Sequence, residues 1–176
     1  MQELVNEVIS IMKLQFEKHH AIVNFKTSGE NFIIEADRLH MTSVLYNLLD
    51  NALKYSKENP VIGVLLSSLP RDIIELKVSD NGIGIAKEYQ PRIFEKFFRV
   101  PMGNEHNIKG YGLGLSYVSE IVHRHMGFIV VDSELGKGTT FTVKIPRKEA
   151  DVICFDDKRK MVKKTMHIGF KKDKLA

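Results

Sequence analysis

The chain has 176 residues, of which 43% are hydrophobic and 27% are charged. These values are typical of one soluble globular domain with some additional length, and they exclude collagen-like, low-complexity and wholly disordered chains. No apolar run reaches the roughly 18 residues that a membrane-spanning helix needs, and the start of the chain, MQELVNEVIS, lacks the pattern of a signal peptide. The single cysteine, Cys154, cannot form an intramolecular disulfide, which favours a cytoplasmic location.

The charge of the chain is concentrated at its C-terminal end. The formal net charge is +4 and the isoelectric point is about 9.1, which would suggest nucleic-acid binding if the charge covered the fold. Residues 147–176 hold ten of the 26 Lys and Arg residues and five of the 22 acidic ones, which leaves 16 basic and 17 acidic residues in 1–146. We therefore predict a nearly neutral folded part with no nucleic-acid partner and a flexible basic tail over 148–176. A short amphipathic helix in the run KRKMVKK, touching an acidic partner or a membrane surface, is the alternative for this tail.

The first predicted element is an amphipathic helix over residues 3–18, where apolar residues recur at spacings of three and four. Two β-rich runs at 21–27 and 31–36 flank a Ser-Gly-Glu turn and predict a hairpin. Asp37 is a favourable N-cap for the long helix that follows, which ends before Pro60.

Two further hairpins are predicted in the second half of the chain. The runs at 61–68 and 72–80 are apolar and β-branched, and a turn containing proline joins them. The runs at 127–135 and 138–146 alternate as strands around a Gly-Lys-Gly turn.

Between these hairpins lie an irregular segment and a helix. Residues 81–111 have no sustained period, which inside a compact domain is typical of a functional loop, and residues 112–126 predict a helix. The whole order predicts an α+β fold in which helices lie on one face of a mixed, largely antiparallel sheet.

The long helix carries a polar stripe beside its apolar face. At 100° per residue, Asn47, Asn51, Lys54 and Tyr55 fall on one side of this helix and the leucines fall on another. A solvated surface is one interpretation. Because asparagine is a poor helix former, two of them one turn apart favour ligand binding instead.

A carboxylate and two glycines follow the apolar strand that ends at residue 80. Asp80 at a strand end can accept a hydrogen bond from an exocyclic amine such as that of adenine, and Gly82 and Gly84 let a planar ring approach the backbone. A simple Asp-Asn-Gly turn is the alternative interpretation.

A glycine-rich turn opens the next helix, with the sequence Gly-Tyr-Gly-Leu-Gly-Leu at 110–115. Free amides and the positive end of a helix dipole make such a turn suited to phosphate. The turn is neither the dinucleotide fingerprint nor a P-loop, since the required spacing and the Gly-Lys-Ser/Thr are missing.

The order and spacing of these segments resemble the catalytic and ATP-binding domain of sensor histidine kinases, within the gyrase, chaperone and histidine-kinase ATPase superfamily. The second asparagine lies 29 residues before Asp80, and the first glycine of the turn lies 30 residues after it. The resemblance spans about residues 1–146 and is carried by an N box at 47–55, a G1 box at 80–84, an F box at 94–99, a G2 box at 110–115 and a closing hairpin at 136–141.

This resemblance implies a Bergerat-type ATP-binding fold, a two-layer α/β sandwich, over residues 19–147 with a lid at about 86–110. Residues 1–18 would be a helix that continues from an upstream dimerisation domain, which we expect to be absent from this chain. The full-length protein would then be a homodimer, with a membrane anchor as one option.

The resemblance also implies roles for the matching residues. Asn51 would coordinate Mg²⁺ with Asn47 in support, Lys54 would lie against the phosphates, Asp80 would hold the adenine amine, and Arg99 would contact a phosphate or the group in transfer. For Arg99 a flexible surface position is the alternative. The other ATP-binding residues that it implies are Tyr55, Gly82, Gly84, Ile85, Phe94, Gly110, Tyr111, Gly112, Leu113, Gly114, Leu115 and Thr140.

The residue at position 47 favours one activity over another. Superfamily members that hydrolyse ATP place a glutamate there, and Asn47 has no useful basicity, so the resemblance implies transfer of the γ-phosphoryl group to a histidine. None of the seven histidines stands in an acceptor motif, so we expect the acceptor on a separate dimerisation domain, with a response regulator downstream and no autophosphorylation by this chain alone. A non-catalytic nucleotide-binding regulatory module is the alternative, and a chaperone- or topoisomerase-type ATPase is disfavoured.

Overall fold

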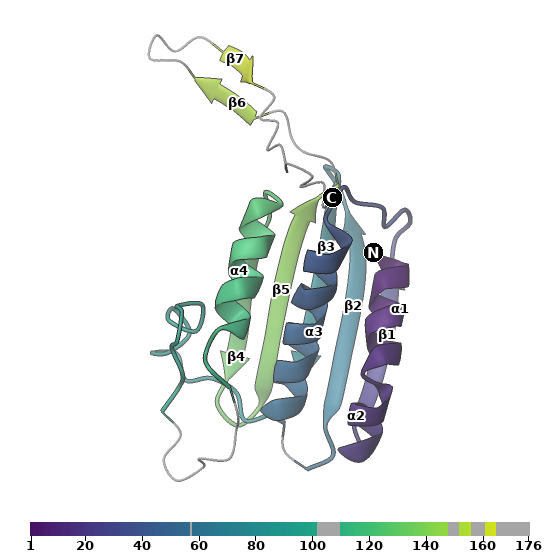
Figure 1. Cartoon of the computed structure of the whole chain (residues 1–176), viewed down its shortest axis with the longest axis vertical. Helices are drawn as coiled ribbons and strands as arrows, with labels where there is room; N and C mark the ends of the chain where they lie inside the picture. The colour runs from purple at the N-terminus through teal and green to yellow at the C-terminus, as the bar shows by residue number, and fades with distance from the viewer. Residues whose placement is uncertain (57, 102–109, 148–151, 156–160, 165–176) are drawn as a thin grey trace, which may run out of the picture.

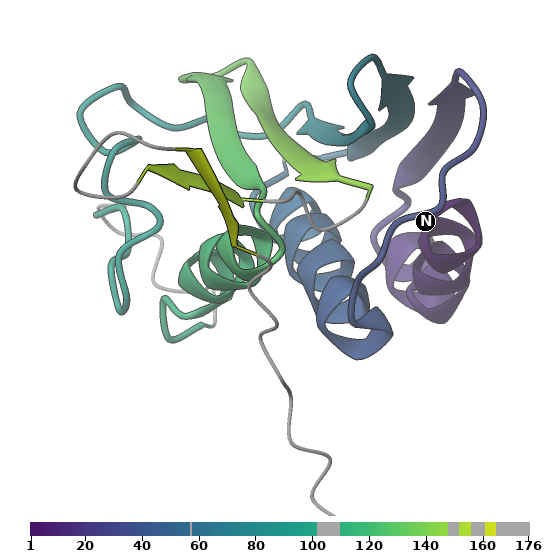
Figure 2. The same ribbon diagram turned by 90° about the horizontal axis from the view of Figure 1, so that it is seen from above.

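A computed structural model gives the structure of the chain, and it describes residues 1–56, 58–101 and 110–147 in full and residues 152–155 and 161–164 as backbone. The described chain forms a five-stranded sheet with helices packed on one of its faces, as Figures 1 and 2 show. The helices are α1 (Gln2–Ile11), α2 (Lys13–Lys18), α3 (Arg38–Lys54) and α4 (Gly114–Arg124). The strands of the sheet are β1 (Ile22–Ser28), β2 (Val61–Leu69), β3 (Ile73–Asp80), β4 (Phe128–Glu134) and β5 (Gly138–Pro146).

The strand order of the sheet is β1-β2-β3-β5-β4. β1 and β2 are parallel, and every other neighbouring pair is antiparallel. Seen from above, the helices form one layer and the sheet the other (Figure 2). The predicted α+β class, a two-layer sandwich with a mixed and largely antiparallel sheet, is confirmed.

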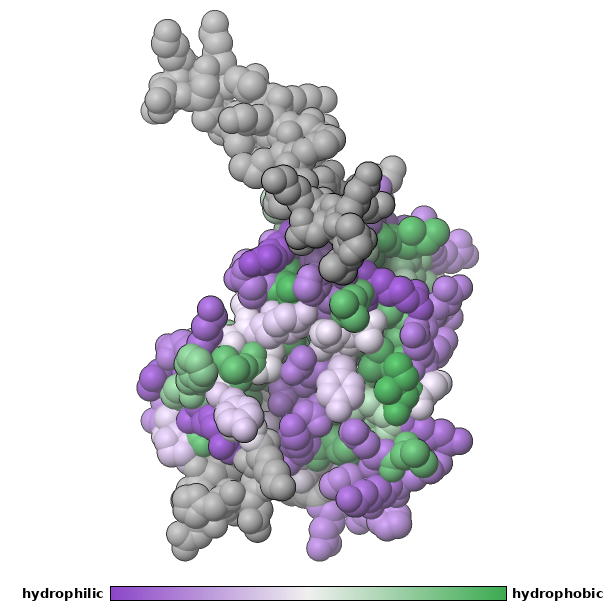
Figure 3. All heavy atoms as spheres, in the orientation of Figure 1, coloured by the Kyte–Doolittle hydropathy of each residue, from purple (hydrophilic) through white to green (hydrophobic). Residues whose placement is uncertain are grey.

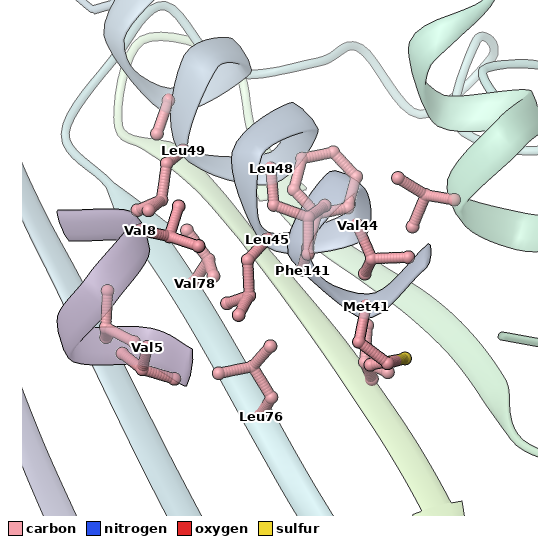
Figure 4. Packing of buried hydrophobic residues seen from close by; sticks show 14 of the residues in the cluster. Val5, Val8, Met41, Val44, Leu45, Leu48, Leu49, Leu76, Val78 and Phe141 are labelled. Carbon is pink, nitrogen blue, oxygen red and sulfur yellow. The ribbon is translucent and has the colours of Figure 1, made fainter. Parts of the chain in front are cut away.

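The core lies between the two layers. Because side chains alternate along a strand, Leu76 and Val78 of β3 and Phe141 of β5 all point toward the helices, where they meet Leu45 and Leu48 of α3 (Figure 4). Each of these five side chains is buried. α3 crosses the middle of the sheet, so its apolar stripe is covered along most of its length and its polar stripe is directed away from the core.

The predicted hairpin over residues 21–36 is wrong. β1 pairs in parallel with β2, and residues 31–36 form no strand. Parallel strands need a crossover, and here the crossover is α3, so the chain after β1 must leave the sheet for the helix layer. Phe32 and Ile34 are half-buried and pack on the core, whereas the residues next to them in the chain are exposed. This alternation is the pattern that is typical of a strand.

The other predicted strand pairs and the start of the long helix are confirmed. β2 pairs with β3, and β4 pairs with β5, in antiparallel register. The Asp37 carboxylate accepts a hydrogen bond from the His40 amide at 2.9 Å, as expected of an N-cap. α4 is shorter at each end than the predicted 112–126, because its first turn begins at Gly114 and its last ends before Gly127.

The predicted helix at residues 3–18 is divided into α1 and α2 by a break at Met12. Its buried side chains belong to the same cluster as those of α3 and the sheet, and they are Leu4, Val5, Val8, Met12 and Phe16. Packing is therefore continuous across the boundary expected between residues 18 and 19. The dimerisation domain expected before this helix stays a prediction.

The basic tail is described in part. Two short strands, β6 (Val152–Phe155) and β7 (Met161–Lys164), form an antiparallel pair of their own. The helix considered for the run at 158–164 is absent from its described portion, which is β7; the rest of the tail lies outside the described residues. Across the described chain, no helix has the length and apolar character needed to cross a bilayer.

We expect the first two helices to contribute directly to the stability of the domain. Figure 3 shows exposed apolar groups on the side of the molecule where α1 and α2 lie. Apolar residues of these helices are therefore buried only where they face the core. Leu4 is 5% exposed, whereas Leu14 is 78% exposed. Urea denaturation of Leu4→Ala should show a loss of about 2–4 kcal/mol in the free energy of unfolding, because a buried leucine leaves a cavity. The matched control Leu14→Ala should change it by less than about 0.5 kcal/mol; equal effects would show that α1 is peripheral.

Candidate functional site

A cavity of about 320 Å³ lies at one end of the molecule, between the C-terminal half of α3, the end of β3 and the turn before α4. Most of the predicted site residues line it, although they come from segments far apart in the sequence. They are Asn47, Asn51, Lys54, Tyr55, Asp80, Gly84, Ile85, Arg99, Gly110, Tyr111, Gly112, Leu113, Gly114 and Leu115. The part of the predicted lid at residues 102–109 lies outside the described residues.

One wall of the cavity is the polar stripe of α3. The Asn47 side-chain amide donates to the carbonyl of Ser43 at 2.8 Å, and its Oδ1 lies so near Gly114 that a Cβ there would come within 2.7 Å. Asn47 therefore lies directly against the first turn of α4, where a side chain at position 114 would have no room. The Asn51 side chain makes no hydrogen bond within the part of the chain that the structure describes, so its amide can serve a ligand.

Lys54 is held at the same wall by a carboxylate one turn earlier. Its Nζ lies 2.5 Å from Asp50 Oδ2, and both residues line the cavity. A partly exposed pair one helical turn apart contributes about 0.3–0.5 kcal/mol. An incoming anion can therefore replace Asp50 as the partner of Lys54 at little cost.

Asp80 lines the cavity at the point where β3 ends. Its Oδ1 accepts hydrogen bonds from the amide of Gly82 at 2.8 Å and from the amide of Thr139 at 3.2 Å. Burial raises the pKa of the Asp80 carboxyl above its ordinary value, and the two amides offset part of this effect. The second carboxylate oxygen accepts no hydrogen bond from the described residues and is open to a ligand donor.

The loop after β3 is clamped between α3 and the β4–β5 turn. The amide of Ile83 donates to the carbonyl of Tyr55 at 3.0 Å, and the carbonyl of Ile83 accepts from the amide of Gly136 at 2.6 Å. Gly84 has φ of +70°, and a Cβ there would lie 2.1 Å from the carbonyl oxygen of Glu134. Backbone meets backbone at this point, so a side chain has no room.

The glycine-rich turn before α4 is tied to the F box. The amide of Phe97 donates to the carbonyl of Gly112 at 2.9 Å, and Arg99 Nη1 donates to the carbonyl of Gly110 at 3.1 Å. α4 then begins with no side-chain cap among the described residues. Its first amides are therefore free to bind an anion at the cavity wall.

Three predicted site residues lie outside the cavity lining. Gly82 is buried beneath the loop, where a Cβ would come 2.3 Å from the carbonyl oxygen of Tyr55. Phe94 packs edge-on against Phe141, with ring centroids 6.4 Å apart, and so supports a lining residue from behind. Thr140 lies in a shallow hollow on the open face of the sheet. Its neighbour Thr139 lines the cavity instead, because adjacent strand residues point to opposite faces.

The cavity also has lining residues that the sequence motifs did not predict. They are Asp50, Ile83, Ile93, Phe98, Val100, Thr139 and Phe141. For two of them, the spacing in the sequence could have indicated a place at the site. Asp50 stands four residues before Lys54, and Thr139 shares the strand alternation of the buried Phe141. The apolar members had no signal beyond ordinary core patterning.

Comparisons with known proteins agree with this architecture. Residues 36–149 match the family described as histidine kinase-, DNA gyrase B- and HSP90-like ATPases. The sensor protein RprX of Bacteroides fragilis is 40% identical over 151 residues, which is 85% of this chain and 29% of RprX. The catalytic domain of the histidine kinase ThkA in a nucleotide-free form has 28% identity and a TM-score of 0.72, with 84% of this chain and 94% of that domain covered. ThkA in complex with the response regulator protein TrrA gives 28% identity and a TM-score of 0.70, with 84% of this chain and 40% of that chain covered.

The fold and the cavity thus define a domain of the ATPase type with a partly open site at one end of the layer interface. The chain belongs to the family of histidine kinase-, DNA gyrase B- and HSP90-like ATPases. Within that family it has the catalytic ATP-binding domain that sensor histidine kinases share. It spans less than a third of the length of RprX.

The raised pKa of Asp80 makes a prediction about stability. The folded state holds this proton more tightly than the unfolded chain does, so the wild type should lose stability relative to Asp80→Asn as the pH rises through the elevated pKa. The asparagine oxygen can still accept from both amides, so the comparison isolates the charge. Urea denaturation of both proteins between pH 3.5 and 7, with an NMR titration of the Asp80 carboxyl, measures the effect. A wild type that gains on the variant as the pH rises would mean that the two amides outweigh burial.

Proposed function

We propose that this domain binds Mg²⁺ and ATP together and transfers the γ-phosphoryl group to a histidine on a separate dimerisation domain. The observation that carries the proposal is the polarity of one cavity. The cavity is lined by an acceptor, the Asp80 carboxylate, and also by the free amides of α4, Lys54 and Asn51. A nucleotide has the matching pattern, with an amine on its base and negative charge on its phosphates.

The base end of the cavity is suited to adenine. The free oxygen of Asp80 can accept a hydrogen bond from the exocyclic amine. Ile85, Ile93 and Phe141 supply apolar surface around it for a planar ring. A 6-oxo purine would set its carbonyl oxygen against this carboxylate, so the site should disfavour it.

The phosphate wall is suited to a metal ion that arrives with the nucleotide. Mg²⁺ prefers oxygen ligands and is usually held by one or two protein groups together with phosphates and water. The Asn51 amide oxygen fits this role because it lines the cavity without an intramolecular partner among the described residues. No group of three or more His, Cys, Asp or Glu side chains able to hold an ion by itself occurs in the described chain. When bound, Mg²⁺ would neutralise charge on the phosphates.

The cavity favours transfer over hydrolysis because its described lining offers no free base. Asn47 stands where an ATPase would carry its glutamate, and its amide is engaged with Ser43. The carboxylates among the described lining residues are Asp50 and Asp80. The first is paired with Lys54 and the second with two amides, so neither is placed to activate water beside the phosphates.

The proposed partners follow from the separation of the nucleotide site on this domain from the acceptor histidine. The acceptor histidine would come from a dimerisation domain, the full-length protein would be a homodimer, and a response regulator would take the phosphoryl group afterwards. ThkA was solved in complex with the response regulator protein TrrA, and its catalytic domain shares this fold, which supports such a partner. A regulatory module that binds nucleotide without transfer is the alternative, and the second experiment below separates the two.

The first experiment tests nucleotide binding. Isothermal titration with Mg²⁺ and ATP should give saturable binding to the wild type and a 10- to 100-fold larger Kd for Asp80→Asn, since a charged hydrogen bond is worth about 1.5–3 kcal/mol. Asp132→Asn is the control, because this carboxylate is exposed on the edge strand β4 away from the cavity lining. Unchanged affinity in Asp80→Asn would remove Asp80 from the base site.

The second experiment tests transfer. The domain is mixed with histidine-bearing dimerisation domains of its relatives and labelled ATP, and acid-labile phosphohistidine is measured. Phosphohistidine should form in these mixtures and be lost with Asn51→Ala. Nucleotide binding without phosphohistidine across the tested partners would favour the regulatory module, and steady phosphate release without an acceptor would favour an ATPase.

A further inference from the structure

A hydroxyl cluster behind the base end of the cavity has no place in the proposed function so far. Ser133 of β4 lies at its centre and is half-buried. Its Oγ accepts from the amide of Ile85 at 2.8 Å, donates to the carbonyl of Gly138 at 2.9 Å and lies 2.9 Å from Thr139 Oγ1. Ser133 thus touches both the loop after β3 and the residue whose amide binds Asp80.

The number of hydrogens fixes the direction of these bonds. A serine hydroxyl has one hydrogen, and Ser133 donates it to the carbonyl of Gly138. In the contact between Ser133 and Thr139, the threonine hydroxyl must then be the donor. Thr139 lines the cavity, and with its hydrogen directed at Ser133 it can present only lone pairs to a ligand.

A glutamine holds this cluster in place. Gln90 Nε2 donates to the carbonyl of Ile85 and to the carbonyl of Ser133, each at 2.9 Å. Both hydrogens of this amide nitrogen are used, so the loop and β4 are locked at a fixed separation. The main chain of Ser133 is therefore held beside the loop whose amide its hydroxyl accepts from.

We infer that Ser133 sets base specificity by making the Thr139 hydroxyl an acceptor beside the Asp80 carboxylate. The inference rests on the proposed function, which it deepens. The two hydrogens of the 6-amino group of a purine can satisfy both acceptors, whereas a 6-carbonyl oxygen in the same place has no hydrogen and would be repelled by both. Ser133 itself touches no ligand, so it is a positioning residue.

The test measures Kd for ATP and for GTP, each with Mg²⁺, by displacement of a fluorescent ATP analogue. In Ser133→Ala the Thr139 hydroxyl is free to donate, so GTP affinity should rise about three- to tenfold while ATP affinity falls, the range expected for one hydrogen bond. The double variant Ser133→Ala/Thr139→Val should lose the gain for GTP, because no hydroxyl remains to donate. Ser133→Thr keeps a hydroxyl and should keep the wild-type preference.

Ser79→Ala is the matched control. Ser79 is also a half-buried strand serine that donates to a main-chain carbonyl, that of Gly63 at 3.3 Å, but it faces the hollow on the open side of the sheet. Its substitution should leave the ratio of the two affinities unchanged. If Ser133→Ala weakens ATP and GTP equally, or if the gain for GTP persists in the double variant, the inference is overturned while the proposed function stands. A wild type that binds neither nucleotide would overturn the proposed function as well.

Discussion

The site depends on a contact between backbones at the end of the sheet. A Cβ on Gly82 would lie 2.3 Å from the carbonyl oxygen of Tyr55, one on Gly84 would lie 2.1 Å from that of Glu134, and one on Gly138 would lie 2.0 Å from that of Asp80. Three glycines thus let α3, the loop after β3 and the β4–β5 turn approach within van der Waals distance. The approach holds the amides that bind Asp80 in place, and so it determines where the carboxylate points.

A second constraint is the presence of groups of both signs in one cavity. Burial and two amides surround the Asp80 carboxylate, whereas Lys54 is held at the α3 wall by Asp50. The start of α4 also lines the cavity and adds the partial positive charge of a helix N-terminus. One ligand that has both a hydrogen-bond donor and negative charge can satisfy these groups together.

The sequence predicted the layers and most of the cavity wall, and its errors have a common cause. Periodicity identifies which residues face a core, but it does not name the partner that covers them. Residues 31–36 have the alternation of a strand and yet pack on the core without one, because β1 finds its neighbour in β2 after α3 has crossed over. Thr140 was assigned to the site in place of Thr139 for a related reason. The motif predicted that this part of β5 lies at the site, but the alternation of side chains along β5 decides that Thr139 and not Thr140 faces the cavity.

The sequence by itself determined the order of the elements, the polar stripe of α3, the carboxylate at the end of β3 and the glycine turn before α4, since each depends on local spacing or on a cap. Only the tertiary structure shows which hydrogen bonds these groups form within the fold and which groups stay available to a ligand. Asn47 is engaged and Asn51 is free, and Lys54 is paired with Asp50. Ser133, which belongs to no motif, contacts the hydroxyl of Thr139, and Gln90 binds the main-chain carbonyls of Ile85 and Ser133. The bonds of Ser133 to Ile85 and of Gln90 to Ser133 join residues more than 40 positions apart, so local patterns hold no information about them.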